Sequence, residues 1–368
     1  MGLFQIIITS LSLIFGWIFH VELLNPLQKT PWAFWLGIAF FATGFLTILA
    51  RAFLDDVDRI ESGMFFFMGF FSFLLVGIFF KELFWIGLWT FKRDPSLAHG
   101  TSSVIGVFVL ATILYFTAHH KAHAGPVVET RLIPTPKNFS PGFKLRIVQI
   151  SDLHIGSQIG PKYISTVVQL TNSQNPDVIV LTGDIGDGEP EKYISKASDL
   201  KKLQAKYGIF YVNGNHEYYR GVKEWAEAFR SFGFVTLENQ SALLSVENTP
   251  VAFVGTTDYQ PNLKQALEGL TDDAYKILLA HRPDIADQAS EAGMHLQLSG
   301  HTHRGQFIPW SWMIRLFHKY TYGLYRIGNM YLYVNSGTGF WGPALRVGSQ
   351  SEISVMEIRS EQTLPCTN

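Results

Sequence analysis

The stretch that decides the fold is IVQISDLHIG, residues 147–156. A short apolar run, rich in β-branched residues, predicts a buried strand, and Asp152 and His154 follow it at once. Side chains at i and i+2 of an extended segment point to the same side, so this aspartate and this histidine can bind one centre. The stretch therefore predicts a strand that ends in a pair of candidate metal ligands.

Four further predicted strands end in the same way. Apolar runs at 178–181, 210–212, 277–280 and 296–298 lead into TGD (182–184), NGNHE (213–217), His281 and SGHTH (299–303). Glycines 183, 214 and 300 adjoin candidate ligands, where a tight turn or a close backbone approach is needed. Because ligands bind at the carboxyl ends of strands in open α/β sheets, we expect these side chains to meet at one edge.

The candidate ligands are carboxylates, a carboxamide and imidazoles. This mixture suits divalent Mn, Fe or Zn, and the absence of cysteine from it excludes a structural zinc finger. The single cysteine, Cys366, cannot form an internal disulfide, so it neither requires nor excludes an oxidising compartment. The formal net charge of -1 gives no reason to expect binding of nucleic acid.

The series Asp152-x-His154, Gly183-Asp184, Gly214-Asn215-His216-Glu217, His281 and Gly300-His301-x-His303 resembles the signature of the calcineurin-like metallophosphoesterases. The order and spacing match across residues 146–303, and the piece from Tyr333 to Glu352-Ile353 resembles a bacterial, membrane-anchored branch of that family. The resemblance implies an α/β fold: a four-layer β-sandwich flanked by helices, preceded here by an all-α transmembrane region of about four helices.

The resemblance also implies roles for the site residues. The first metal ion is expected on Asp152, His154, Asp184 and His303. The second is expected on Asp184, Asn215, His281 and His301, so that Asp184 bridges the two ions. His216 is expected not to bind metal but to stabilise or protonate the leaving oxygen, while a metal-bridging hydroxide attacks phosphorus.

The expected activity is metal-dependent hydrolysis of a phosphodiester, a pyrophosphate or a phosphomonoester. A lipid-linked or envelope substrate is inferred from the expected membrane location. The alternative is a non-catalytic membrane scaffold that uses the same fold, or a fold that has lost its metals. Arg304 is predicted either to contact an anionic substrate or to be an ordinary surface arginine.

The N-terminal third contains four apolar runs, Leu3–Phe19, Trp32–Ala50, Gly63–Phe80 and Val104–Thr117. Runs of this kind predict membrane-spanning helices, and hence a multi-pass membrane protein. The resemblance to the bacterial branch implies that this membrane is the bacterial cell membrane. A cleaved signal peptide is the alternative for the first run, which lacks a basic start. Basic residues are spread almost evenly over the two sides, so the side that the catalytic domain faces stays open.

The chain is therefore predicted to have three parts. Residues 1–120 form the transmembrane region, residues 121–143, rich in Pro and Gly, form a linker or extended lead-in, and residues 144–360 form the catalytic domain. The segment Trp310–Tyr325 is aromatic and basic. It is predicted either to contact a membrane surface or a lipid substrate, or only to cover the core. His119, His120 and His123 are interpreted as a polar cap or as a metal site.

Overall fold

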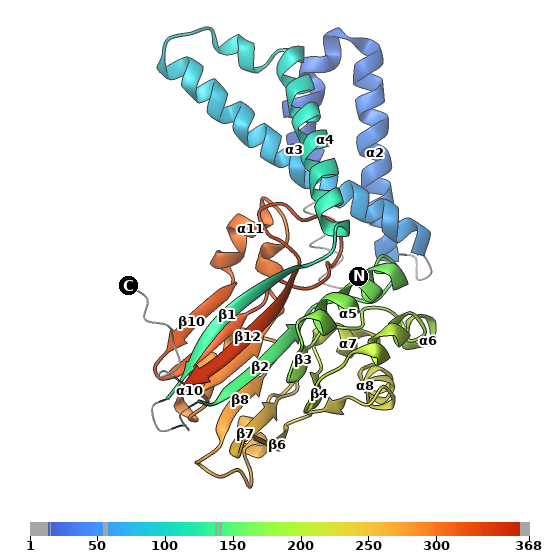
Figure 1. Ribbon diagram of the computed structural model, residues 1–368. Helices are drawn as coiled ribbons and strands as arrows, with labels where there is room; N and C mark the ends of the chain where they lie inside the picture. The colour runs from blue at the N-terminus through green and yellow to red at the C-terminus, as the bar shows by residue number, and fades with distance from the viewer. Residues whose placement is uncertain (1–13, 15, 54–57, 137–138, 140–141, 361–368) are drawn as a thin grey trace. The chain divides into compact units, whose positions relative to one another are not determined.

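The computed structural model describes residues 14, 16–53, 58–136, 139 and 142–360 (Figure 1). The chain divides into two compact units. The helical unit comprises Met1–His120 and Gly342–Val347, and the α/β unit comprises Lys121–Trp341 and Gly348–Asn368. Helices and strands carry the labels of Figure 1.

From His20 onward, the described residues of the helical unit form three long helices and three short ones. They are η1 (His20–Leu24), η2 (Asn25–Lys29), α2 (Pro31–Phe53), α3 (Asp58–Thr90), η3 (Pro95–Ala98) and α4 (Thr101–His123), whose last residues pass into the second unit. Among the described residues, two helices, Glu61–Thr90 and Thr101–His123, are long and apolar enough to cross a membrane, and the apolar helix Pro31–Thr47 is shorter. The predicted count of about four spans is therefore not confirmed, and most of the run Leu3–Phe19 lies outside the described residues.

A buried lysine lies within this unit. Lys81 Nζ lies 2.5 Å from Glu22 Oε2 and 2.9 Å from Glu82 Oε1. Helix α3 continues through Lys81 and Glu82 as one helix, so the two apolar stretches around this pair are not separate elements. The carboxylates compensate the charge of the lysine where water is scarce.

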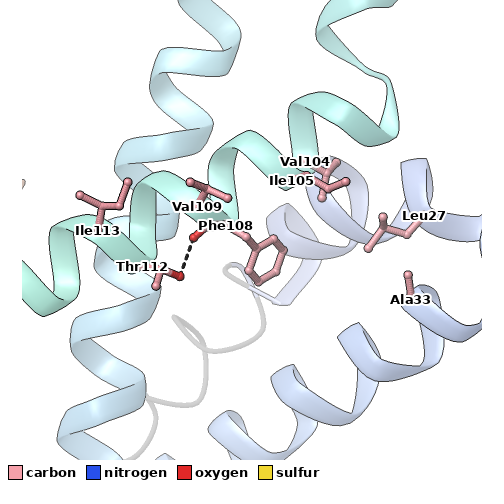
Figure 2. A pocket seen from close by; sticks show the side chains of 8 residues that line it. All are labelled: Leu27, Ala33, Val104, Ile105, Phe108, Val109, Thr112 and Ile113. Carbon is pink, nitrogen blue, oxygen red and sulfur yellow. Dashed lines mark hydrogen bonds between the residues drawn. The ribbon is translucent and has the colours of Figure 1, made fainter.

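An apolar pocket of about 360 Å³ lies between the start of α2 and helix α4 (Figure 2). The hydroxyl of Thr112 donates to the carbonyl of Phe108 on the same helix, at 2.8 Å, so the wall presents carbon. The lining residues are Leu27, Ala33, Val104, Ile105, Phe108, Val109, Thr112 and Ile113.

The described residues of the α/β unit form two six-stranded sheets. The first has the order β1 (Val127–Thr135), β12 (Glu352–Ser360), β2 (Lys144–Ile150), β3 (Val178–Thr182), β4 (Gly208–Val212) and β5 (Val235–Thr236). The second has the order β10 (Gly323–Ile327), β11 (Met330–Val334), β9 (Leu296–Ser299), β8 (Tyr275–Leu279), β7 (Thr249–Gly255) and β6 (Gln240–Val246). Strands β2 to β5 are parallel, as are β7, β8, β9 and β11, so their carboxyl ends share an edge within each sheet.

Short helices connect and cover the strands. They are α5 (Pro161–Ser173), α6 (Pro190–Tyr193), η4 (Lys196–Lys202), α7 (Asn215–Arg220), α8 (Val222–Ser231), α9 (Leu263–Ala266), η5 (Pro283–Ile285), α10 (Ala286–Glu291), η6 (His303–Gly305), α11 (Trp310–Met313) and η7 (Ile314–Leu316). Figure 1 shows α5 and α8 beside the first sheet and α10 beside the second.

Alternation along the strands builds the layers. Phe210 of β4 stacks on Phe253 of β7 with ring centroids 4.6 Å apart, in the core between the sheets. The next residue, Tyr211, points the other way and packs on Phe229 of α8. On the outer side of the second sheet, Val254 belongs to a cluster with Ala286 of α10. The result is the expected order of helix, sheet, sheet and helix.

Part of the segment predicted as a linker or lead-in forms a strand. Strand β1 lies within residues 121–143 and pairs in parallel with β12, from Val127 opposite Glu352 to Thr135 opposite Ser360. The prolines suggested a break in structure, but β1 is an edge strand, and Pro134 can lie there because only one side of the strand needs hydrogen-bond donors.

Candidate metal centre

The loops after β2 and β9 bring together the first group of ligand atoms. Asp152, His154 and His303 each offer one atom within 4.8 Å of the others. His303 Nε2 lies 3.3 Å from Asp152 Oδ1 and 2.9 Å from His154 Nε2. All three residues are buried, so these atoms face one another away from bulk water.

The loops after β3, β8 and β9 supply the second group. Asp184, His281 and His301 again place ligand atoms within 4.8 Å of one another. His281 Nε2 lies 3.1 Å from Asp184 Oδ2. Asp184 also falls in a group with His154 and His216, with Oδ2 3.9 Å from His154 Nε2, and therefore connects both groups.

Asn215 begins α7, directly before His216. Its side chain is buried, and its Oδ1 has no hydrogen-bond donor among the described residues. A buried acceptor without a partner is costly unless something else satisfies it. The backbone N–H of His216, the next residue, donates to Asp184 Oδ1 at 2.8 Å, so Asn215 lies close to Asp184. A cation bound beside Asp184 would therefore satisfy Asn215 Oδ1.

The backbone is held in unusual conformations where the ligands lie. Asp152, His154, Asp184, His301 and His303 all have positive φ, between 49° and 73°. Residues other than glycine avoid this region, and such strain gathers at functional sites.

Three glycines leave space for the side chains of the candidate ligands. A Cβ on Gly214 would lie 2.2 Å from Asp184 Oδ1, and one on Gly300 would lie 2.1 Å from Asp152 Oδ2. A Cβ on Gly183 would lie 2.6 Å from Nδ1 of His281. The positions of the glycines, the orphaned amide oxygen and the donor set together fit a site for divalent cations.

The comparisons with known proteins agree with this geometry. The profile of the calcineurin-like phosphoesterases matches residues 145–305. A metallophosphoesterase of Campylobacter jejuni is 31% identical over 270 residues, which are 70% of this chain and 70% of that protein. The chain is a member of the calcineurin-like phosphoesterase family. The family resemblance expected from the strand-end motifs is thereby confirmed.

Other relatives of this phosphoesterase come from both bacteria and animals. YkuE of Bacillus subtilis, also named a metallophosphoesterase, is 34% identical over 231 residues, which are 60% of this chain and 80% of that protein. A zebrafish protein named as a transmembrane protein with a metallophosphoesterase domain is 30% identical over 282 residues. That match spans 72% of this chain and 64% of the zebrafish protein.

Asp187 is a residue of the phosphoesterase site that the sequence did not single out. Its Oδ2 lies 3.2 Å from His154 Nδ1, and its Oδ1 lies 2.5 Å from His216 Nδ1. Burial raises its pKa, but the interactions with these two histidines outweigh burial and lower the pKa of Asp187 to about 2. One carboxylate therefore orients a candidate ligand and the predicted acid, and leaves the Nε2 atom of each ring for the centre.

The charges of the centre favour a cation. Burial opposes a positive charge on His281, yet the adjacent Asp184 raises the pKa of His281 to about 10. Burial and the positive charge expected on His281 lower the pKa of His301 to about 2. The carboxylates thus favour positive charge at this point, which a divalent cation supplies when bound.

The outer part of the site is aromatic. The His216 ring lies 5.5 Å from the rings of both Trp341 and Tyr219, measured between centroids. The Arg304 guanidinium lies 4.3 Å from the centre of the Tyr322 ring and makes a cation–π interaction with it. Contact of Arg304 with a substrate stays a prediction.

Proposed function

We propose that the chain is a dinuclear, metal-dependent phosphoric ester hydrolase. The observation that supports this most strongly is the double membership of Asp184, which shares one ligand group with His281 and His301 and another with His154. The first ion would be held by Asp152, His154, Asp184 and His303. The second would be held by Asp184, Asn215, His281 and His301.

The ligand chemistry suits Mn, Fe or Zn, and we propose manganese as the first ion to test. When bound, a pair of such ions supplies Lewis-acid activation of water and of the phosphoryl group. The substrates proposed on this basis are phosphodiesters, pyrophosphates and phosphomonoesters.

His216 is proposed as the proton carrier. Its Nδ1 is occupied by Asp187, and its Nε2 lies on the side of the centre, 4.0 Å from Asp184 Oδ2. An imidazole fixed in this way can deliver a proton from Nε2 to the leaving oxygen. Its partial exposure lets it meet substrate, whereas the ligands beneath it are buried.

We further propose that residues 1–120 anchor the enzyme in a membrane, by several spans, and that 144–360 form the catalytic domain. Two described helices have the necessary length and apolar character, and the vertebrate relatives are named transmembrane proteins. The expected location is the bacterial cell membrane, and the expected substrates are lipid-linked rather than nucleic acids.

The test is metal content measured together with turnover, on the full chain purified in detergent. The wild type should hydrolyse an aryl phosphodiester with added Mn²⁺ and stop when a chelator is added. Asp184→Asn should lose both metal and turnover, whereas His216→Ala should keep its metal and lose roughly 10²–10⁴-fold in rate. Asp199→Asn, which alters an exposed ion pair with Lys202, is the matched control.

If the metal-loaded, folded wild type turned over no phosphoester, the proposed enzymatic function would be rejected. The non-catalytic membrane scaffold would then be the remaining hypothesis. Full activity in His216→Ala would remove the role assigned to that residue. Stoichiometry near one ion per chain in the wild type would reject the dinuclear centre.

A further inference from the structure

A cluster of exposed apolar side chains lies on the short helices α11 and η7. Within eight residues, five large apolar side chains are exposed, and Leu316 and Phe317 are the most exposed, at 78% and 71%. We call this set the apolar rim; it consists of Trp310, Trp312, Met313, Leu316 and Phe317. Five exposed aromatic and aliphatic side chains within one short segment are unusual on a surface that faces only water.

The local fold does not depend on burying these side chains. The backbone closes its own turns: Ser311 N–H donates to the carbonyl of Phe307 at 2.9 Å, and Phe317 N–H donates to that of Ile314 at 3.1 Å. Further along, Tyr320 is buried and donates through its hydroxyl to Asp287 of α10 at 2.9 Å. The segment is therefore held from both ends while the rim remains exposed.

The sequence around the rim is basic. Residues 292–351 contain no aspartate and no glutamate. Of the basic residues in this stretch, Arg315, Lys319 and Arg326 are exposed, Lys319 pairs with Asp287 of α10 at 2.7 Å, and Arg346 is buried. Arg315 and Lys319 flank the most exposed apolar residues and are themselves exposed. A basic and apolar surface of this kind is complementary to an anionic lipid surface, where aromatic side chains settle at the level of the headgroups.

The rim adjoins the metal centre. Thr302, which lies between His301 and His303, donates through its hydroxyl to the carbonyl of Thr321 at 2.5 Å. Residues 303–320 thus form an excursion whose two ends meet beside the candidate ligands. Near the C-terminal end of this excursion, the ring of His318 packs edge-on against that of His301, with centroids 5.6 Å apart.

We propose that the apolar rim inserts into the headgroup region of an anionic phospholipid bilayer, and so presents the metal centre to phosphoesters at the membrane surface. Docking itself does not require catalysis; the consequence for substrates rests on the proposed function. The exposed basic residues Arg315 and Arg326 favour anionic headgroups over a second copy of the chain, which would bring like charges together, and over an uncharged peptide.

Spin labels measure the docking directly. Cys366 is the single cysteine, so Cys366→Ser gives a background for Leu316→Cys, Phe317→Cys and, as control, Leu243→Cys. Leu243 is 57% exposed and lies on β6, the edge strand of its sheet opposite β10. The full chain is reconstituted in nanodiscs of phosphatidylcholine with phosphatidylglycerol, and collisions of the label with oxygen and with a water-soluble nickel complex are compared.

Labels at 316 and 317 should collide preferentially with oxygen, and the label at 243 with nickel. Removal of phosphatidylglycerol should shift the 316 and 317 labels toward the nickel pattern. The proposal is overturned if all three labels show the aqueous pattern in anionic nanodiscs. It is equally overturned if the spectrum of the label at 316 or at 317 is broadened by the same label on a second chain. That result would indicate a second copy as the occupant.

Activity provides the second readout. The double variant Leu316→Ser/Phe317→Ser should lower the ratio of turnover on a phospholipid in vesicles to turnover on a soluble aryl phosphodiester by roughly tenfold or more, given the apolar area withdrawn from lipid. Leu243→Ser should leave that ratio as in the wild type, and an equal ratio in both variants would contradict the proposal. If no substrate is turned over, the proposed function fails, and the spin-label measurement still decides the docking.

Discussion

The carboxylate of Glu217 accepts a hydrogen bond from the backbone N–H of Asp184 at 3.0 Å. It also accepts from the N–H groups of Ile185 at 2.6 Å, Gly186 at 3.0 Å and Gly214 at 2.8 Å. A fully buried carboxylate thus ties the loop after β3 to the start of α7. The position of Asp184, the proposed shared ligand, therefore depends on a carboxylate that binds four backbone N–H groups.

Glu217→Gln should destabilise the enzyme and weaken metal binding. Each carboxylate oxygen accepts two of the four hydrogen bonds, so whichever end becomes NH₂ faces two donors, and the cost should be about 2–4 kcal/mol. The measurement is chemical denaturation together with metal titration. Glu224→Gln, on the nearby helix α8, is the control, and equal stability of the two variants would contradict the role of Glu217.

Asp187→Asn should separate the orientation of the His216 ring from the binding of metal. The variant keeps the shape of the side chain but removes the negative charge that lies beside Nδ1 of both His154 and His216. Metal affinity should fall about 10- to 100-fold, as when the side chains that hydrogen-bond to metal ligands are replaced. Turnover at saturating metal should fall further, because His216 also loses the partner that fixes its tautomer. Recovery of the full wild-type rate by excess metal would show that Asp187 acts through the metal alone.

The ligand set could be predicted from the sequence because its signal is local. Asp152, Asp184 and His281 each follow an apolar run directly or within two residues, and the run alone marks the end of a strand. The structure brings the predicted side chains to one place, although their binding of metal stays a prediction. Glu217 had a usable signal as well, since it lies at the third position of α7 after Gly214, where a glutamate can reach back to the helix start.

Asp187 could not be predicted in the same way. It lies in a loop, and its partners come from the ends of two other strands, so no spacing in the sequence relates them. Strand β1 was not predicted for a related reason. Its pairing partner, β12, is more than two hundred residues away, and only that long-range pairing makes the proline-containing segment a strand.

Gly214→Ala tests the close approach of the backbone to the centre. The new Cβ would lie 2.2 Å from Asp184 Oδ1 and 2.5 Å from its backbone nitrogen, so the loop after β3 must move. We expect a loss of about 1–3 kcal/mol in stability and a loss of the shared ligand geometry. Gly160→Ala is the matched control, because nothing lies within 4 Å of its Cβ. Metal content should fall in the first variant alone; normal content there would show that the loop adapts.

His295 should make the α/β unit sensitive to acid. Its ring stacks on Tyr275 with centroids 4.9 Å apart, and its Nδ1 accepts a hydrogen bond from the backbone N–H of Lys276 at 2.9 Å. Protonation would destroy this acceptor. Burial and the charge of Lys276 lower the pKa of His295 to about 4, from 6.5 in the unfolded chain.

The unfolded state therefore binds more protons than the folded state between pH 4 and about 6.5, and stability must rise with pH across that window. The contribution of His295 is fully present above the unfolded pKa and is lost as the pH falls toward 4. His295→Gln removes this titration and keeps an acceptor of similar reach, so its Tm should change less between pH 7 and pH 5 than that of the wild type. Histidines of the metal centre titrate in both proteins and cancel in the comparison. An equal change of Tm in the two would show that His295 is protonated in the folded state as readily as in the unfolded chain.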